Sequence, residues 1–543
     1  MSISQFLSFE RDQVSHVLGV LLGLGVAWLF SVAVYRVWFH PLAGIPGPFL
    51  AKLTDFYGGY IASKGINHYH LYELHKKYGV AVRYGPNRVS FNSAKAIRDI
   101  YSSTKPLQKS AGYRALLLTG GIPSLFSSID KIFHGRRRRI IGQGFSEAAM
   151  KSYEPIVQER IDRFSDVLIR DADNEGWGRG YDMSRLCAGL TFDVMAALIF
   201  GRPFRILEDP KGLSYVIDAI ISAGRSVGIF HHLPIFGNNE FFFRVRGLFR
   251  LLFLNMQDIR NIKHFLTLSN AMTEERSKTE AARAAGEDIV KAQGTPAKDI
   301  FSYILDAKDP ETGMHLSYTE LWSEARVMII AGSDTTSTAL AGAFYYLSRD
   351  REILEKLRKE LHAAFATEGE IWPGAKLTAC TYLKHVVDEA LRMSSPIGGI
   401  LWRETQTDYI VEGRHLPKGT DVGVPVYATH HNPEYYPDPH TFNPDRWDES
   451  VVGAEAVAAA KSAWLPFQTG ARSCIGRPLA MMELMLTLAR TVYKYDIRVE
   501  AGKEEIAETE VVKGVREFKT RDQLTAATVG PFIQFKRREE TVQ

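Results

Sequence analysis

The sequence contains few cysteines: only Cys187, Cys380 and Cys474 occur among 543 residues, and no two of them form a Cys-x-x-Cys pair. An odd number of widely separated cysteines supports neither a disulfide framework nor a structural zinc site. The chain also lacks an Asn-x-Ser/Thr sequon, which agrees with a body that does not enter the secretory lumen. We therefore expect at most one of the three thiols to have a special chemical role.

A large excess of one charge is also missing. The chain has 66 basic and 62 acidic residues, a net charge of +4, which is too small at this length to favour nucleic acid as the main partner. With 45% hydrophobic and 24% charged residues, the composition is globular and excludes a disordered, collagenous or wholly membrane-embedded chain. The motifs GxxxxGK[ST] and HExxH are absent, so nucleotide triphosphate and metalloprotease chemistry have no motif to support them.

One short motif, taken alone, would indicate an α/β-hydrolase. Residues 224–228, GRSVG, fit the GxSxG nucleophile elbow of α/β-hydrolases. An elbow follows a strand of a parallel sheet, and the chain shows no repeated βα units. We therefore do not expect hydrolase chemistry.

A long uncharged run near the N-terminus predicts a membrane anchor. Residues 17–35 carry no charge, and 19 residues at about 1.5 Å each make a helix of about 28 Å, close to the hydrocarbon thickness of a bilayer. A cleaved signal peptide is the alternative, because residues 31–33 have a small-x-small form, but residues 10–12 are not a basic n-region. We expect residues 1–16 to be an N-terminal tail and residues 17–35 a transmembrane helix, with a cytosolic body slightly favoured by the flanking basic residues.

After the anchor the pattern changes to a hinge and then to a helical body. Residues 36–50 contain three prolines that prevent the helix from continuing. Short β-patterned pieces at 81–84 and 88–91 precede a long helix-rich region. The body, residues 51–543, is therefore expected to be mainly α with small β-sheets (α+β), and the periodicity does not divide it into domains.

Cys474 differs from the other two cysteines by its surroundings. It lies in a glycine-punctuated loop, residues 467–476, directly before a helical pattern. A thiolate before a helix start gains from the positive end of the helix dipole and from free backbone N–H groups, and Arg472 adds a cation nearby. Cys474 is therefore a candidate metal ligand, whereas Cys187 and Cys380 are expected to be ordinary buried cysteines.

The same loop, FQTGARSCIG, resembles the FxxGxRxCxG haem-binding loop of the cytochrome P450 family, whose cysteine is the proximal thiolate of haem iron. Glu389 and Arg392 match the ExxR of this family, and their i,i+3 spacing places them on one helix face. FNPDRW resembles its PERF segment, with Asp445 in place of the usual glutamate. Alone, a Glu-Arg pair would be a solvated surface pair. The resemblance implies instead that Glu389, Arg392 and Arg446 form a buried structural group behind the haem.

A third match, AGSDTT, lies in an apolar helical stretch expected at residues 318–347, which a capping-box pattern opens at Ser317. Without chemistry, the acid and alcohol would mark only a kink, because a threonine hydroxyl can bond to the helix carbonyl four residues earlier. The resemblance implies an oxygen-activating groove instead. In it, Gly332 leaves space beside the iron, Thr335 hydrogen-bonds dioxygen and Asp334 belongs to a proton relay.

Haem propionates are anions, and the resemblance implies which cations contact them. HGRRR, beginning at His134, resembles the family's WxxxR helix with histidine in place of tryptophan, so Arg138 and also His134 are propionate candidates. Arg403 and Arg472 are candidates by their matched positions. The tetra-arginine run 136–139 is also typical of a nuclear-localisation or nucleic-acid patch, but helical residues point about 100° apart. One or two of the four should face any single partner, and the others are expected to face solvent.

Residues 229–256 interleave phenylalanines with arginines. This suits a membrane interface, and a core helix with a basic outer face is an equal alternative on sequence alone. In the P450 family the matching region lies above the substrate entrance and dips into the bilayer, which favours the first interpretation. Apolar stretches at 116–118 and 396–401, where the family has its substrate pocket, indicate a largely apolar substrate.

The resemblance implies a membrane-anchored haem-thiolate monooxygenase with haem b, most similar to fungal microsomal enzymes of secondary metabolism. Expected partners are NADPH-cytochrome P450 reductase, an apolar small molecule and the endoplasmic reticulum membrane, with the catalytic domain in the cytosol. Two alternatives stay open. One is oxidative coupling, desaturation or ring formation without oxygen insertion. The other is a non-catalytic haem protein, which would need the Cys474 thiolate but not the Asp334-Thr335 pair.

Overall fold

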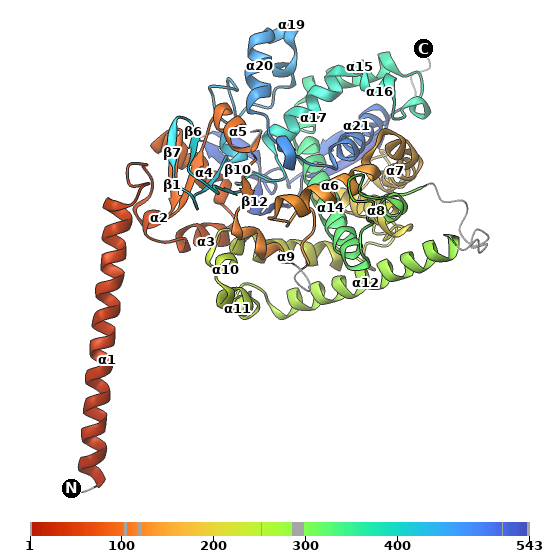
Figure 1. The fold of residues 1–543 in the computed structure, drawn as a ribbon. Helices are drawn as coiled ribbons and strands as arrows, with labels where there is room; N and C mark the ends of the chain where they lie inside the picture. Colours follow the sequence, from red (N-terminus) through yellow and green to blue (C-terminus); the bar gives the residue numbers. More distant parts are fainter. Residues whose placement is uncertain are drawn as a thin grey trace.

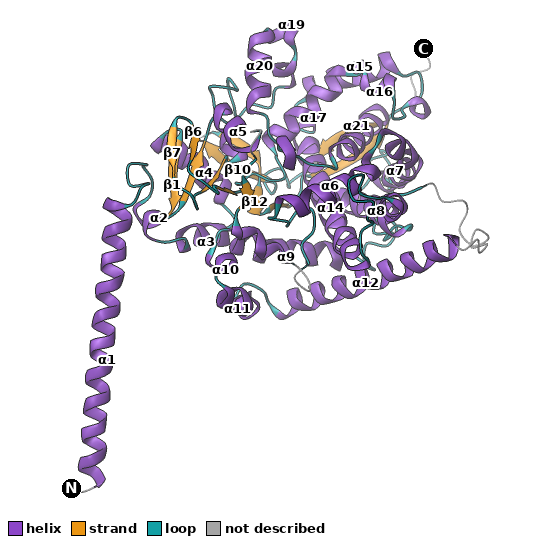
Figure 2. Cartoon of the chain, viewed as in Figure 1, coloured by secondary structure: helices purple, strands orange, loops and turns teal. Residues whose placement is uncertain are grey.

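The computed structural model describes residues 3–102, 106–117, 122–250, 252–284, 298–512 and 514–539. Figure 1 shows a helix-rich body from which one long N-terminal helix projects. Figure 2 shows that the strands form small groups among the helices. This is the mainly helical α+β class that the sequence predicts.

The first half of the body is built mostly from helices. Their bounds, with 3-10 and π-helical turns marked η, are α1 (Ile3–Val34), η1 (Tyr35–Phe39), α2 (Phe49–Leu53), α3 (Phe56–Ser63), α4 (Asn67–Tyr78), α5 (Ala94–Tyr101), η2 (Ala111–Leu116), α6 (Lys131–Gly142), η3 (Gln143–Phe145), α7 (Glu147–Leu168), α8 (Met183–Phe200), α9 (Tyr215–His231), α10 (Ile235–Asn238), α11 (Glu240–Arg250) and α12 (Met256–Ala284).

The second half continues with the helices that hold the candidate motifs. They are α13 (Ile300–Asp306), α14 (Tyr318–Leu347), α15 (Arg351–Ala364), η5 (Glu368–Glu370), α16 (Ala375–Thr378), α17 (Thr381–Met393), α18 (Val426–His430), η6 (Pro444–Trp447), α19 (Glu449–Val452), α20 (Ala454–Ala463), η7 (Gly470–Arg472) and α21 (Arg477–Lys494).

The largest sheet has the strand order β1-β2-β8-β5-β3, and within the described residues its β2–β8 pair is the only parallel one. A three-stranded sheet has the order β4-β14-β9, and three hairpins complete the β-structure. The strands are β1 (Ala81–Gly85), β2 (Arg88–Phe91), β3 (Gln108–Lys109), β4 (Tyr181–Asp182), β5 (Arg403–Glu404), β6 (Tyr409–Val411), β7 (Arg414–Leu416), β8 (Asp421–Gly423), β9 (Tyr495–Val499), β10 (Glu508–Val512), β11 (Val515–Phe518), β12 (Thr520–Gln523), β13 (Thr525–Thr528) and β14 (Phe532–Arg537).

Helix α14 is the centre of the hydrophobic core. It packs against α8 over most of its length and also contacts α17 and α21. Its start is set locally, because Ser317 accepts from the N–H of Glu320 and the Glu320 carboxylate accepts from the N–H of Ser317. The helix begins and ends at the residues predicted from the sequence. It therefore provides a rigid support that crosses the molecule.

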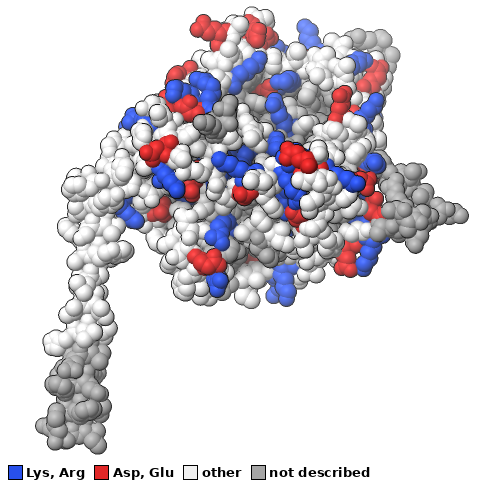
Figure 3. All heavy atoms as spheres, viewed as in Figure 1, with Lys and Arg blue, Asp and Glu red and all other residues white. Residues whose placement is uncertain are grey.

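Helix α1 has the length and composition of a membrane span. Residues His16–Phe39 form the apolar stretch, and none of it is buried. Figure 3 shows the described part of this helix without charged side chains as far as the body. A second helix of sufficient apolar length, α8, is 83% buried and is a core helix. The predicted span, residues 17–35, thus lies in an exposed apolar helix.

Two other sequence interpretations can be compared with the fold. The GxSxG pattern lies inside α9, so it is not the strand-to-helix elbow that hydrolase chemistry needs. The sequence also predicts a polar loop around residues 286–298. Residues 286–297 of this loop, and Leu118 of the predicted pocket, lie outside the described residues.

Candidate active site

Cys474 lies in the loop between η7 and α21. Its N–H donates to the carbonyl of Phe467 at 2.8 Å, so the loop folds back on itself just before the helix starts. Gly470 has a φ of 73°, and a Cβ there would lie 2.0 Å from the carbonyl oxygen of Tyr101. Only glycine fits this close approach, which explains one of the glycines in the motif.

The Cys474 side chain is accessible to solvent, yet burial raises the pKa of its thiol. The N–H groups of Gly476 and Arg477 and the charge of Arg138 oppose this rise without cancelling it. Accessible surface and desolvation together indicate that the thiol faces an internal space rather than open water. A bound metal would oppose this rise in the pKa, because a thiol that coordinates a metal is deprotonated.

Two arginines contact the surroundings of Cys474 in different ways. Arg138 donates to the carbonyl of Ser473 at 2.7 Å and to its hydroxyl at 3.1 Å, and its charge acts on the Cys474 thiol. Arg472 donates to the carbonyls of Ser128 and Ile129 at 2.7 and 2.9 Å, in the chain segment before α6. Arg138 is thus a cation beside the thiol that the sequence did not indicate for this role.

In α14 the groove residues surround an accessible spot in an otherwise buried helix. Ala331 is exposed, although most of the helix is buried. The hydroxyl of Thr335 donates to the carbonyl of Ala331 at 2.6 Å, which is the back-bond expected from the sequence. Burial raises the pKa of Asp334 to about 6, and the Thr525 hydroxyl opposes this. A carboxyl group with this pKa can carry a proton near neutral pH.

Gly332 lies where α14 meets α8. A Cβ on Gly332 would lie 2.6 Å from the Sδ of Met195, so its missing side chain makes room for α8. That Gly332 also leaves space beside the iron stays a prediction. Ala331, the exposed neighbour, is the small residue that sequence reasoning missed.

Four cations from distant segments gather at one place: Lys109 on β3, Arg138 on α6, Arg403 on β5 and Arg472 in η7. Lys109 and Arg403 are buried, and burial followed by the charges of the three arginines lowers the pKa of Lys109 far below its usual value. Their hydrogen bonds go to carbonyl oxygens and to the Ser473 hydroxyl. Among the described residues, no carboxylate is within ion-pair distance of any of the four.

His134 lies against the same group. Burial and then Arg472, Lys109, Arg138 and Arg403 lower the pKa of His134 to about 3. It is therefore neutral near pH 7 and can donate only a neutral N–H to an anion. Lys109 was missed by sequence reasoning, because a lone lysine in a two-residue strand has no motif around it.

The tetra-arginine run does not form a solvent-facing patch. Arg137 is fully buried and pairs with Glu324, and it lies 3.2 Å from Glu320. Arg136 pairs with Glu320 at 2.9 Å, and Arg139 pairs with Asp309 at 2.7 Å. The expectation that the others face solvent is thus wrong for Arg137, because α14 presents two carboxylates to α6.

Glu389, Arg392 and Arg446 meet in the core as expected. Arg392 donates to both carboxylate oxygens of Glu389 at 2.9 and 2.8 Å, and Arg446 donates to one at 2.9 Å. Burial opposes ionisation of Glu389, but Arg392 and then Arg446 outweigh it and lower the pKa of Glu389. Trp447 donates to the second oxygen at 3.0 Å. Every oxygen of this buried charge is therefore satisfied.

The donor set fits a haem. Four desolvated cations without a carboxylate need an anionic ligand, and two propionates would supply it. A soft thiol at an internal surface, close to a helix start, suits iron. Helix α21, which follows the thiol loop, packs on α14, so the thiol and the groove residues lie on neighbouring elements. These features fit a protein that would hold an anionic metal cofactor through a cysteine.

Comparison with known proteins gives the family. A cytochrome P450 family model matches residues 46–520. Cytochrome P450 monooxygenase apf7 of Gibberella fujikuroi is 38% identical and covers 94% of this chain and 96% of its own. Cytochrome P450 monooxygenase poxM of Penicillium oxalicum is 39% identical, with 94% and 93% covered, and AKT7 of Alternaria alternata is 34% identical, with 95% and 97% covered. The chain belongs to the cytochrome P450 family, a family of haem-thiolate oxidoreductases.

Proposed function

We propose that this protein is a membrane-anchored monooxygenase that oxidises a largely apolar small molecule in fungal secondary metabolism. It would use haem b, dioxygen, and electrons that NADPH supplies through cytochrome P450 reductase. The catalytic domain would lie on the cytosolic side of the endoplasmic reticulum. The family membership and the fungal relatives support the general reaction, and the residues described above support the details.

The observation that carries the proposal is the combination of Cys474, the cation group and the α14 groove. Haem, when bound, supplies the iron at which dioxygen is activated. Cys474 would bind its iron, and Arg138, Arg403, Arg472 and Lys109 would bind its propionates. His134 would add a neutral hydrogen bond.

The groove residues would control protons rather than bind iron. The Thr335 hydroxyl already gives its hydrogen to Ala331, so its oxygen lone pairs remain free to accept from an ordered water or a protonated ligand. Asp334, with its raised pKa, would pass a proton from the protein interior to this point. The open space at Ala331 would admit the reacting group of the substrate.

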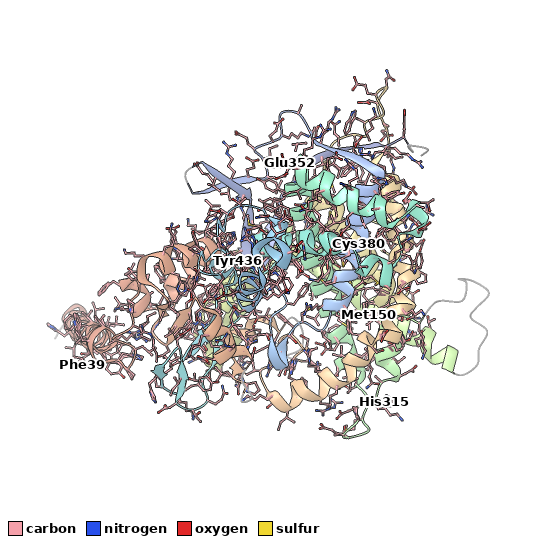
Figure 4. The ribbon with its side chains drawn as sticks, turned by 90° about the horizontal axis from the view of Figure 1, so that it is seen from above. Phe39, Met150, His315, Glu352, Cys380 and Tyr436 are labelled. Carbon is pink, nitrogen blue, oxygen red and sulfur yellow. The ribbon has the colours of Figure 1, made fainter. Side chains whose placement is uncertain are left out.

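The metal ligand can be tested with the three cysteines of the chain. Cys474→Ser should abolish the red-shifted Soret band of the reduced carbon monoxide complex. Cys187 and Cys380 are buried and have raised thiol pKa values, so Cys187→Ser and Cys380→Ser should leave the band unchanged. Figure 4 shows Cys380 among the helices of the body. An unchanged band in Cys474→Ser would overturn the ligand assignment.

The membrane contact would consist of α1 and a second apolar surface. Phe241, Leu248 and Leu252 are exposed at α11 and just after it, whereas Phe230 and Phe236 are buried in a small cluster. The phenylalanine-rich segment thus has both a core part and an apolar surface part. The side chains of Phe243, Arg246 and Arg250 lie outside the described residues.

The anchor can be tested by a deletion that spares the body. Buried Arg83 donates to the carbonyl of Arg36 at 2.8 Å, so residues 2–34 should be removed and Tyr35–Phe39 kept. The shortened protein should keep its thiolate spectrum and be released from membranes by carbonate, whereas the full chain should remain. Quantitative release of the full chain by carbonate would contradict a spanning helix.

A further inference from the structure

A second group of metal-ligating side chains lies outside the candidate active site. His431 and His440 belong to the segment between α18 and η6, and Glu517 lies on β11. The ligand atoms of these three residues are within 4.8 Å of one another. His431 and Glu517 are buried, and His440 is 13% exposed. Tyr436, labelled in Figure 4, marks the same segment.

The hydrogen bonds of His431 leave its Nε2 nitrogen facing another hydrogen-bond acceptor. Its Nδ1 lies 2.9 Å from the carbonyl of Tyr427, and a carbonyl only accepts, so Nδ1 carries the proton. In a neutral imidazole, Nε2 then carries no hydrogen and can only accept a hydrogen bond. This buried nitrogen has no hydrogen-bond partner and lies 3.3 Å from Oε1 of Glu517. Two acceptors face each other, and a cation between them would remove the conflict.

The neighbours hold both imidazoles as metal sites usually do. A ligating histidine commonly donates its other N–H to a carbonyl or another acceptor, which fixes the ring. For His431 that acceptor is the Tyr427 carbonyl, and for His440 it is the Tyr72 hydroxyl, 2.9 Å from Nε2. His440 Nδ1 lies 2.6 Å from Oε1 of Glu517, and the Tyr427 hydroxyl donates to Oε2 at 2.8 Å. Glu517 is thus oriented as well.

We propose that His431, His440 and Glu517 bind a zinc ion. Two imidazole nitrogens and one carboxylate oxygen form a ligand set that zinc accepts, with a fourth position left for water. Ligand atoms around tetrahedral zinc are about 3.3–3.5 Å apart. The His431–Glu517 distance of 3.3 Å already has this value, whereas His440, the most exposed of the three, lies 2.6 Å from Glu517 and would need to move to reach it.

The zinc ion would fasten a segment that also supports Arg392. The carbonyls of His430 and Pro439, beside the two histidines, each accept from Arg392 at 2.7 Å. The Nε2 of His430 also accepts from the N–H of Leu465, two residues before the cysteine loop. Joining this segment to β11 would therefore stabilise the support behind the candidate haem site without taking part in the reaction.

The test measures zinc in the purified full-length, haem-loaded protein. After incubation with ZnCl2 and dialysis against metal-free buffer, mass spectrometry should find one zinc per chain. Zinc should also raise the melting temperature of chelator-treated protein. His440→Gln and Glu517→Gln should lose both effects. His415→Gln is the matched control, because exposed His415 lies 3.8 Å from the exposed carboxylate of Asp408, and it should keep both.

A milder variant keeps the test decisive if a ligand variant fails to fold. Tyr72→Phe retains the ring and removes only the contact to His440, so zinc affinity should fall by about 10–100-fold. Wild-type protein that holds no zinc and does not shift in melting temperature would overturn the proposal. Equal zinc content in wild type and His440→Gln would overturn it too.

Discussion

Thr335 donates its hydroxyl hydrogen within the helix, and its hydroxyl oxygen can still accept a hydrogen bond in the groove. The bond to the Ala331 carbonyl is 2.6 Å long, so the side chain is held in one rotamer. Thr335→Ala should leave substrate binding nearly unchanged but divert reducing equivalents to hydrogen peroxide, with several-fold less product per NADPH. Measuring product and peroxide in a system reconstituted with the reductase checks this.

Thr338 offers the control for this experiment. It lies on the same helix and makes the same kind of bond, to the Asp334 carbonyl at 3.0 Å, but it is buried against Ala526. Thr338→Ala should change stability without changing the ratio of product to peroxide. Unchanged coupling in Thr335→Ala would favour chemistry without oxygen insertion or a non-catalytic role.

Asp334 links stability to pH with a definite sign. Its folded pKa of about 6 is above the ordinary 3.8, so the folded state binds more protons than the unfolded state between these values. The resulting stability is complete below about pH 4 and is lost as the pH rises through 6. At pH 8, Asp334→Asn should therefore have a higher unfolding free energy than wild type, by at most about 3 kcal/mol. Near pH 4 the two proteins should be equally stable. Denaturant midpoints across this pH range give the comparison.

The same substitution should slow the reaction, because an amide cannot supply a proton. Turnover should fall by about 100-fold, so Asp334→Asn should be more stable and less active. Asp193 is the matched control: it is a buried aspartate on α8 with its pKa also raised to about 6, and it accepts from Ile206 and Leu207. Asp193→Asn should keep its turnover. Equal loss in both variants would contradict a proton-relay role.

At the scale of the helices, Gly332 sets how closely α14 approaches α8. Gly332→Ala would place its Cβ 2.6 Å from Met195 Sδ. Because methionine can move, the expected cost is about 1–3 kcal/mol of unfolding free energy, with the thiolate spectrum unchanged. Thermal unfolding of the haem-loaded protein measures this cost.

Gly247 on α11 provides the comparison, since a Cβ there would meet nothing within 4 Å. Gly247→Ala should be neutral or stabilise by about 0.5–1 kcal/mol. A changed thiolate spectrum in Gly332→Ala without loss of stability would indicate that Gly332 lies beside the iron.

Across the whole molecule, the sequence predicts what local patterns encode. The start of α14 follows from its capping box at Ser317, and the cysteine loop and the Glu389–Arg392 pair follow from short motifs. Arg137 could not be placed in this way, because its partner Glu324 is 187 residues away. The environment of Gly332 also depends on α8, a distant helix. These two contacts between distant elements, rather than the elements themselves, were missed.

Lys109, the member of the cation group that the sequence did not indicate, shows the same limit. The group as a whole links the stability of the chain to its cofactor. Lys109, Arg138, Arg403 and Arg472 come from β3, α6, β5 and η7, so repulsion among them opposes the closure of the body without an anion. Haem propionates would pair with these cations, so that attraction would replace the repulsion. Haem should therefore stabilise the fold beyond the contribution of the iron–sulfur bond.

Lys109→Met should have opposite effects in the two forms of the protein. In the haem-free chain it removes a buried amine whose charged form is disfavoured by burial and by three neighbouring guanidinium groups, so the unfolding free energy should rise by about 1–4 kcal/mol. In the haem-loaded chain it removes a propionate partner, so haem should transfer faster to apomyoglobin. Urea unfolding of both forms and the transfer rate provide the measurements. Lys95→Met, at an exposed lysine paired with Asp99, should change neither quantity. If Lys109→Met destabilised the haem-free chain and left haem transfer unchanged, the cations would be structural and would not bind the cofactor.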